Sequence, residues 1–167
     1  MTNSFIVRPA RESDLETILQ YSTAMAKETE GRPLDTTTLR AGIIALMRSP
    51  KHGSFILAER ACEGRQSPVG QLMITYEWSD WRNGEFWWVQ SVYVHPAWRR
   101  QGVYRAMHRY ILDQAKQQTN ICGIRLYVER NNPTAQTVYQ RMGLSPTGYL
   151  VYEQDFVLPR LSSAPED

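Results

Sequence analysis

The stretch HPAWRRQGVYRAMHRY, residues 95–110, joins two segments with different hydrophobic periods. Before it, residues 86–94 (FWWVQSVYV) are aromatic and β-branched, which predicts a strand. After it, apolar residues recur at helical spacing, at Val103, Met107, Tyr110 and Ile111. This spacing predicts a helix that begins just after Gly102. A turn needs only the glycine, so the adjacent cations Arg99 and Arg100 indicate a local site for an anion.

The start of that helix offers the geometry that an anion requires. A helix beginning after Gly102 leaves unpaired N–H groups over residues 101–105, at the positive end of the helix dipole. Glycine lets the backbone approach a ligand closely, and the two arginines can add charge-assisted hydrogen bonds. The alternative is a plain helix start with a solvated basic turn, and the spacing alone does not decide between them.

Composition sets the outer limits. The chain has 167 residues, which fits one domain with its own core, and a net charge of +2. Such a small net charge favours neither nucleic acid nor an anionic membrane as a partner, so an anion site must be local. Cys62 and Cys122 lack the spacing of a disulfide framework or a zinc site and are expected to be buried thiols. The absence of a signal-like start and of a membrane-length apolar run predicts a cytoplasmic protein.

The remaining pattern predicts one mixed sheet flanked by helices. Strands are expected at residues 5–7, 54–59, 69–76, 86–94, 124–128 and 149–156, and helices at 14–31, 36–48, 103–119 and 133–142. The order βααβββαβαβ combines an antiparallel meander with a strand–helix–strand crossover, which is an α/β architecture with a mostly antiparallel sheet. Residues 1–158 are expected to form a single domain, and residues 159–167 a frayed polar tail.

Two segments resemble the GCN5-related N-acetyltransferase (GNAT) superfamily. Residues 92–104 (VYVHPAWRRQGVY) resemble its motif A, a strand ending V-x-V-x-P followed by Q/R-x-x-G-x-G/A at a helix start. Residues 132–144 (NPTAQTVYQRMGL) resemble its N-x-x-A-x-x-L/V-Y-x-x-x-G-F/L segment, and residues 6–10 (IVRPA) look like its first strand. The order and separation of these motifs, over nearly the whole chain, identify it as a member of this superfamily.

The resemblance implies acetyl-CoA as the co-substrate and no metal. The pantetheine arm would pair with the strand edge at Val92, Tyr93 and Val94. The pyrophosphate would lie on the loop and helix start formed by Arg99, Arg100, Gln101, Gly102, Val103, Tyr104 and Arg105. Tyr104 departs from the motif, which has a small residue there, and its side chain either crowds the phosphates or points away along the helix. Asn132 would contact the cofactor, cap the next helix, or do both.

The resemblance also implies catalytic roles. Tyr139 would act as general acid for the leaving thiolate, the alternative being a half-buried helix tyrosine, and a backbone N–H near Val92 would stabilise the oxyanion. A carboxylate is needed to take a proton from the ammonium form of the amine, and the family does not fix its position. Glu77 is the first choice, and its rivals are Asp80, Glu85 and Glu129. Each of these is otherwise a solvated surface carboxylate.

Aromatic residues near the acidic turn suggest an acceptor site. Trp78, Asp80 and Gln90 are the predicted acceptor-binding residues, because aromatic walls with carboxylates can hold an ammonium group. Strand alternation sends Trp87 and Trp88 to opposite faces, so at least one belongs to the core. His52, His95 and His108 lack metal-ligand spacing, and His95 is expected to be structural.

The predicted activity is transfer of an acetyl group to a primary amine by direct attack in a ternary complex. The sequence leaves open the amine, which is a small molecule or a peptide, and the choice between monomer and homodimer. One rival is a non-catalytic acyl-CoA sensor of the same fold. Another is a nucleic-acid binder that uses Arg99, Arg100 and Arg105, which the lack of a basic stripe disfavours.

Overall fold

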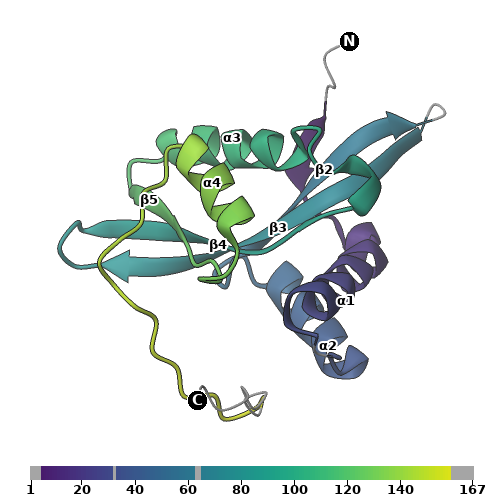
Figure 1. Ribbon diagram of the computed structural model, residues 1–167, viewed down its shortest axis with the longest axis horizontal. Helices are drawn as coiled ribbons and strands as arrows, with labels where there is room; N and C mark the ends of the chain where they lie inside the picture. Colours follow the sequence, from purple (N-terminus) through teal and green to yellow (C-terminus); the bar gives the residue numbers. More distant parts are fainter. Residues whose placement is uncertain (1–4, 32, 63–64, 159–167) are drawn as a thin grey trace.

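A computed structural model of the chain describes residues 5–31, 33–62 and 65–158. A five-stranded sheet lies between two pairs of helices, with α1 and α2 on one face and α3 and α4 on the other (Figure 1). The strands are β1 (Ile6–Pro9), β2 (Ser54–Cys62), β3 (Arg65–Ser79), β4 (Gly84–Val94) and β5 (Ile121–Leu126). The helices are α1 (Leu15–Glu30), α2 (Thr36–Arg48), α3 (Val103–Lys116) and α4 (Pro133–Arg141), with short 3-10 turns at Glu12–Asp14 and Pro96–Trp98.

The strands follow one another across the sheet in chain order. The pairs β1–β2, β2–β3 and β3–β4 are antiparallel, and β5 joins β4 in parallel after the α3 crossover. The predicted antiparallel meander and crossover are therefore confirmed, and with them the α/β class with a mostly antiparallel sheet.

Strand alternation divides the core into two layers. In β2, Phe55 and Leu57 pack with Ile18 of α1 and the α2 helix, whereas Ile56 belongs to the cluster beneath α3. The α3 face of the sheet receives the most deeply buried side chains of that helix, Val103, Met107 and Ile111. The helical spacing predicted after Gly102 thus places α3 against the sheet with a fixed rotation, which orients its N-terminus.

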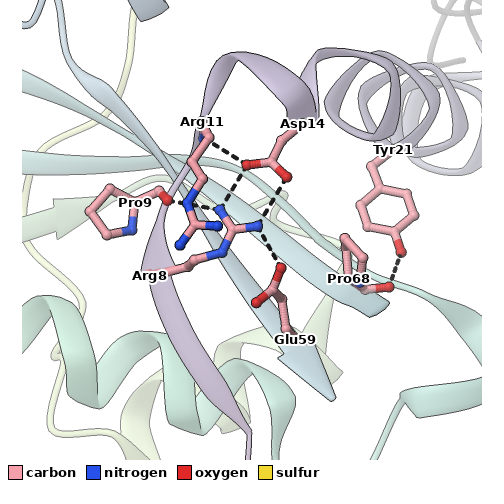
Figure 2. A network of polar contacts seen from close by, with 7 residues as sticks. All are labelled: Arg8, Pro9, Arg11, Asp14, Tyr21, Glu59 and Pro68. Carbon is pink, nitrogen blue, oxygen red and sulfur yellow. Dashed lines mark hydrogen bonds and ion pairs between the residues drawn. The ribbon is translucent and has the colours of Figure 1, made fainter. Parts of the chain in front are cut away.

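A half-buried arginine, Arg8, fixes the start of α1 against the sheet (Figure 2). The Arg8 guanidinium donates to both Asp14 carboxylate oxygens, at 2.7 and 3.0 Å, and to Glu59 at 2.5 Å. Asp14 also accepts from the Arg11 backbone N–H at 2.6 Å. Burial alone would raise the pKa of Asp14, but the hydrogen bonds from Arg8 and Arg11 outweigh it and hold this pKa below its usual value. Hydrogen bonds to Asp14 and Glu59 raise the pKa of Arg8 further, so the network stays charged.

Several predicted boundaries are wrong, mostly within the sheet; α3 also ends at Lys116, three residues before the predicted end at 119. The β2–β3 pairing continues to Cys62 and Arg65, although the predicted strands stop at residue 59 and resume at residue 69; residues 63–64 lie outside the described residues. Strand β5 begins at Ile121, three residues earlier than predicted. Residues 65–67 at the β2–β3 end are exposed, and exposed strand ends can carry polar side chains, so composition does not mark where this pairing stops.

The last predicted strand is not formed. Residues 149–156 have no strand conformation in the structure, and Tyr149, Tyr152 and Phe156 are 79%, 89% and 87% exposed. Alternation alone does not make a strand, because a strand also requires a neighbour, and this segment runs away from β5 past the sheet (Figure 1). The predicted tail, residues 159–167, lies outside the described residues.

Other local predictions can be checked directly. Trp87 is buried beneath α3 and Trp88 lies on the opposite face, as alternation requires. Cys122 is a free thiol, but it is half-buried rather than fully buried as predicted, because β5 is an edge strand. Within the described ranges, no helix is both long enough and apolar enough to cross a bilayer.

Candidate active site

The pairing of β4 with β5 ends before β4 does, and the unpaired edge of β4 beyond that point is called the opening. Their parallel pairing runs from Glu85 and Ile121 to Val89 and Leu126. Beyond that point β4 continues to Val94, whereas the chain after β5 turns toward α4, so among the described residues no strand pairs with β4 on that side. Opposite β3, the register shows one extra residue in β4, and Ser91 there has a φ of 50°. The backbone of Val92 to Val94 therefore borders the opening and can pair with an extended ligand.

The N-terminus of α3 begins directly after this strand and its 3-10 turn. Gly102 precedes the helix with a φ of 89°, and no side chain in the described part of the chain caps this end. The first-turn N–H groups of Val103, Tyr104 and Arg105 have no acceptor within the helix. A Cβ placed on Gly102 would meet no atom within 4 Å, so the backbone conformation, not crowding, requires glycine here. Unpaired donors at the positive end of the helix, with open space beside Gly102, fit a pyrophosphate.

The three arginines of this loop have different surroundings. Arg99 turns toward α1, where it donates to Glu28 at 2.5 Å and to the Val94 carbonyl at 2.9 Å, with its guanidinium 5.6 Å from the Tyr93 ring centroid. It thus ties the loop to α1. Arg100, with a φ of 61°, and Arg105 are exposed beside the helix start, where their charges would favour an anion.

Gln101 and Asn132 support the local backbone. Gln101 donates to the Ala97 carbonyl at 2.8 Å. Asn132 accepts from the Ala135 N–H at 3.0 Å and has Pro133 after it, so the predicted N-cap of α4 is confirmed. Contact of Asn132 with a cofactor stays a prediction.

Tyr139 lies on α4 and faces α3. Its ring meets that of Tyr104 edge-to-face, with centroids 5.5 Å apart and planes at 70°. Tyr104 therefore points away from the helix N-terminus toward α4, which decides between the two orientations that the sequence left open. The Tyr139 hydroxyl is protonated at neutral pH, and burial raises its pKa further, so the hydroxyl is a hydrogen-bond donor there.

A polar patch covers the α1/α2 side of β3, β4 and β5 next to the opening. Gln71 of β3 bonds to Ser22 of α1, and alternation places later odd-numbered β3 residues on the same face. The patch consists of Thr75, Glu77, Trp88, Gln90, Arg125 and Tyr127. Gln90 donates to Thr75 at 2.5 Å and accepts from Tyr127 at 3.4 Å, and the Trp88 and Tyr127 ring centroids are 5.9 Å apart.

Glu77 is the carboxylate of this patch, and its two oxygens are already engaged. One accepts from Arg125 at 2.6 Å, and the other accepts from the Trp88 indole N–H. The Arg125 guanidinium also lies 3.7 Å from the Phe86 ring centroid. To accept a proton from a substrate, Glu77 would have to give up one of these contacts.

The other predicted acceptor residues do not join this patch. Trp78 is 59% exposed and alternates to the face opposite Glu77, and Asp80 is exposed in the turn of the β3–β4 hairpin. Of the rival carboxylates, Glu85 lines a cavity of about 380 Å³ beneath α3, and Glu129 lies exposed between β5 and α4. Sequence reasoning missed Arg125, although a charge inside the apolar run IRLYV is a signal that it has a partner.

Two of the histidines, His95 and His108, form hydrogen bonds with the backbone. His95 accepts from the Ala97 N–H at 3.3 Å, which is the structural role expected for it, and His108 is buried beneath α4. Across the described ranges, no three His, Cys, Asp or Glu side chains are grouped as metal ligands would be.

This sheet, with a helix N-terminus at the point where two parallel strands part, defines the class of fold seen in acetyltransferases. A model of the Acetyltransferase (GNAT) family matches residues 16–144. The structure of a possible acetyltransferase from Clostridium difficile 630 is 38% identical, has a TM-score of 0.83, and aligns over 92% of this chain and 99% of that chain. The chain belongs to the acetyltransferase (GNAT) family, as its two motifs indicated.

More distant structures share the fold. A predicted acetyltransferase from Clostridium acetobutylicum, solved with acetyl-CoA, is 16% identical with a TM-score of 0.71, over 90% of this chain and 96% of that chain. Glucosamine-6-phosphate N-acetyltransferase from Arabidopsis thaliana is 14% identical with a TM-score of 0.68, over 90% of this chain and 98% of that chain. At these identities the likeness concerns the fold alone. A search of curated proteins found no match.

Proposed function

We propose that the protein is a cytoplasmic, acetyl-CoA-dependent N-acetyltransferase with a primary amine as acceptor. One observation carries the proposal: the uncapped N-terminus of α3, with Gly102 at a φ of 89°, follows the strand that parts from β5. The helix end suits the phosphates of a CoA, and the free strand edge suits the amide-bearing pantetheine arm. The acetyl-CoA in the Clostridium acetobutylicum neighbour supports the same ligand for this fold.

The binding residues divide by the part of the ligand that they would meet. Backbone groups of Val92, Tyr93 and Val94 would pair with the pantetheine arm. Backbone N–H groups from Gly102 to Arg105 would receive the pyrophosphate, with the Arg100 and Arg105 side chains beside it. Arg99 would act through its Glu28 pair, by holding the loop against α1.

Bound acetyl-CoA supplies an activated thioester. The amine nitrogen bonds to the acetyl carbon, the C–S bond breaks, the amine gives up a proton and the leaving thiolate gains one. Tyr139 would donate that proton, or a strong hydrogen bond, to the sulfur, because its phenol is protonated at neutral pH and burial raises its pKa further. A backbone N–H near Val92 would stabilise charge developing on the carbonyl oxygen.

The acceptor would approach over the polar patch, where Gln90 lies beside the opening. Glu77 pairs with Phe86, about 20 Å of extended strand from Val92, so it would take the amine proton only through a chain of waters and after releasing Arg125 or Trp88. Trp78 and Asp80 would reach only a long acceptor, since Gly84 at the hairpin and Val92 at the opening are separated by about 26 Å of extended strand.

A non-catalytic acyl-CoA sensor is the second candidate. The pairing of Glu77 with Arg125 favours it, because that pairing leaves no free carboxylate in the polar patch. Such a protein would bind acetyl-CoA and turn over no amine.

The test is thiol release from acetyl-CoA against a panel of amines, with Tyr139→Phe as the variant and Tyr110→Phe as a matched control on α3. We expect release above the rate without amine for one amine class, at least about ten-fold slower in Tyr139→Phe. Calorimetric binding of acetyl-CoA without turnover on any amine would favour the sensor. Absence of both binding and turnover would refute the proposal.

A further inference from the structure

Helix α4 carries the proposed acid but has no fully buried residue of its own. It is short, running only from Pro133 to Arg141, so its orientation depends on side chains of its neighbour. Two residues of α3 reach it: Tyr104 contacts the Tyr139 ring, and His108 hydrogen-bonds to the backbone of Met142 just past the helix.

Tyr104 is seated between the two helices. Its ring contacts both the Tyr139 ring and the His108 ring, with centroid distances of 5.5 and 5.8 Å. Its hydroxyl lies 3.4 Å from His108 Nδ1. The side chain is half-buried, while its backbone N–H belongs to the first turn of α3 at the anion site.

His108 connects Tyr104 to the backbone at the end of α4. It is only 4% exposed, and this burial lowers its pKa although the bond with the Met142 backbone opposes the shift. A neutral imidazole has one N–H and one bare nitrogen. One nitrogen can thus donate to Met142, while Nδ1 accepts from the Tyr104 hydroxyl. The contacts run continuously from Met142 through His108 and Tyr104 to Tyr139.

We propose that Tyr104, seated by His108, is a positioning residue that docks α4 and sets the orientation of the Tyr139 hydroxyl. The inference rests on the proposed function for the catalytic role of Tyr139, but the docking of α4 stands on the contacts alone. The proposal gives a role to Tyr104, which stands where motif A has a small residue. Tyr104 would then contribute to both parts of the site. Its backbone N–H would face the phosphates, and its ring would support Tyr139.

Removing the Tyr104 ring should lower the kcat that depends on Tyr139 and leave the binding of the acetyl-CoA phosphates unchanged, because every substitution at Tyr104 retains its backbone N–H. For Tyr104→Ala we expect kcat to fall about ten-fold, within the range of coupling between residues in contact, and the KM for acetyl-CoA to change by less than about three-fold. Tyr104→Phe keeps the edge-to-face contact and should recover most of the loss, ending about two-fold below wild type. Tyr110→Ala, a truncation on the same helix, is the matched control and should keep the wild-type kcat.

The decisive kinetic experiment is a double-mutant cycle of Tyr104→Ala and Tyr139→Phe. If Tyr104 acts through Tyr139, Tyr104→Ala should cost less than about two-fold in kcat once Tyr139 is phenylalanine. An equal loss in both backgrounds would overturn the proposal, as would a weakened calorimetric affinity for CoA with an unchanged kcat.

Amide hydrogen exchange tests the docking without any activity. Tyr104→Ala should speed exchange over residues 135–142 at least about ten-fold relative to Tyr110→Ala, while the β2–β3 hairpin stays protected in both. Unchanged exchange in α4 would refute the docking role even if no acceptor is ever found. Faster exchange with no effect of Tyr139→Phe on turnover would instead place the failure in the proposed role of Tyr139.

Discussion

Replacing Gly102 with alanine separates the stability of the α3 start from its ability to bind CoA. At a φ of 89° an L-residue incurs a cost of about 1–2 kcal/mol, and the new Cβ meets no atom within 4 Å, so no clash adds to this. The free energy of unfolding, measured in urea, should therefore fall by about 1–2 kcal/mol. CoA affinity should fall at least about ten-fold, or about 1.4 kcal/mol, because the methyl group stands beside the N–H groups that receive the pyrophosphate.

Gly31 provides the matched control. It ends α1 with a φ of 61°, and a Cβ there also meets no atom within 4 Å. Gly31→Ala should lose a similar unfolding free energy and keep wild-type affinity in calorimetric titration with CoA. Wild-type affinity in Gly102→Ala, or an equal loss of affinity in both variants, would refute the placement of the phosphates on this helix.

Three further outcomes follow from the contacts. Arg8→Met leaves two buried carboxylates without their cation and should lower the unfolding free energy by about 3–5 kcal/mol at pH 7, whereas Arg40→Met, at an exposed ion pair, should leave it unchanged within error in the same urea titration. Glu77→Gln should slow acetyl transfer more at pH 7 than at about pH 10, where the amine has already lost its proton, and an equal effect at both pH values would exclude Glu77 as the base. Burial lowers the pKa of His108, so as the pH falls the imidazole is protonated in the unfolded chain before it is protonated in the folded one. The contribution of His108 to the free energy of unfolding should therefore be constant above about pH 6.5 and fall below it. In urea titrations across this range, His108→Gln should lack this contribution.

Features that depend on neighbouring residues in the chain were predictable. The helix start after Gly102, the N-cap at Asn132 and the opposite faces of Trp87 and Trp88 follow from local backbone preference and strand period. The same period failed for residues 149–156, because alternation cannot report whether another strand lies alongside.

Contacts between distant residues were not predictable from pattern. Arg99 was expected at the phosphates, yet it pairs with Glu28, which is 71 residues away, because α1 packs beside the loop. Glu77 was expected to be a free base, and Arg125 engages it across the sheet. A charged side chain takes the partner that the fold brings near, and one sequence without its fold does not reveal that partner.

The most direct test of the account is amide hydrogen exchange of the wild-type protein with and without acetyl-CoA. The account expects slower exchange, on binding, in the backbone N–H groups over residues 92–94 and 103–105, with β1 and β2 unchanged. Saturating acetyl-CoA that protects neither segment, or protects a different face of the sheet, would contradict it.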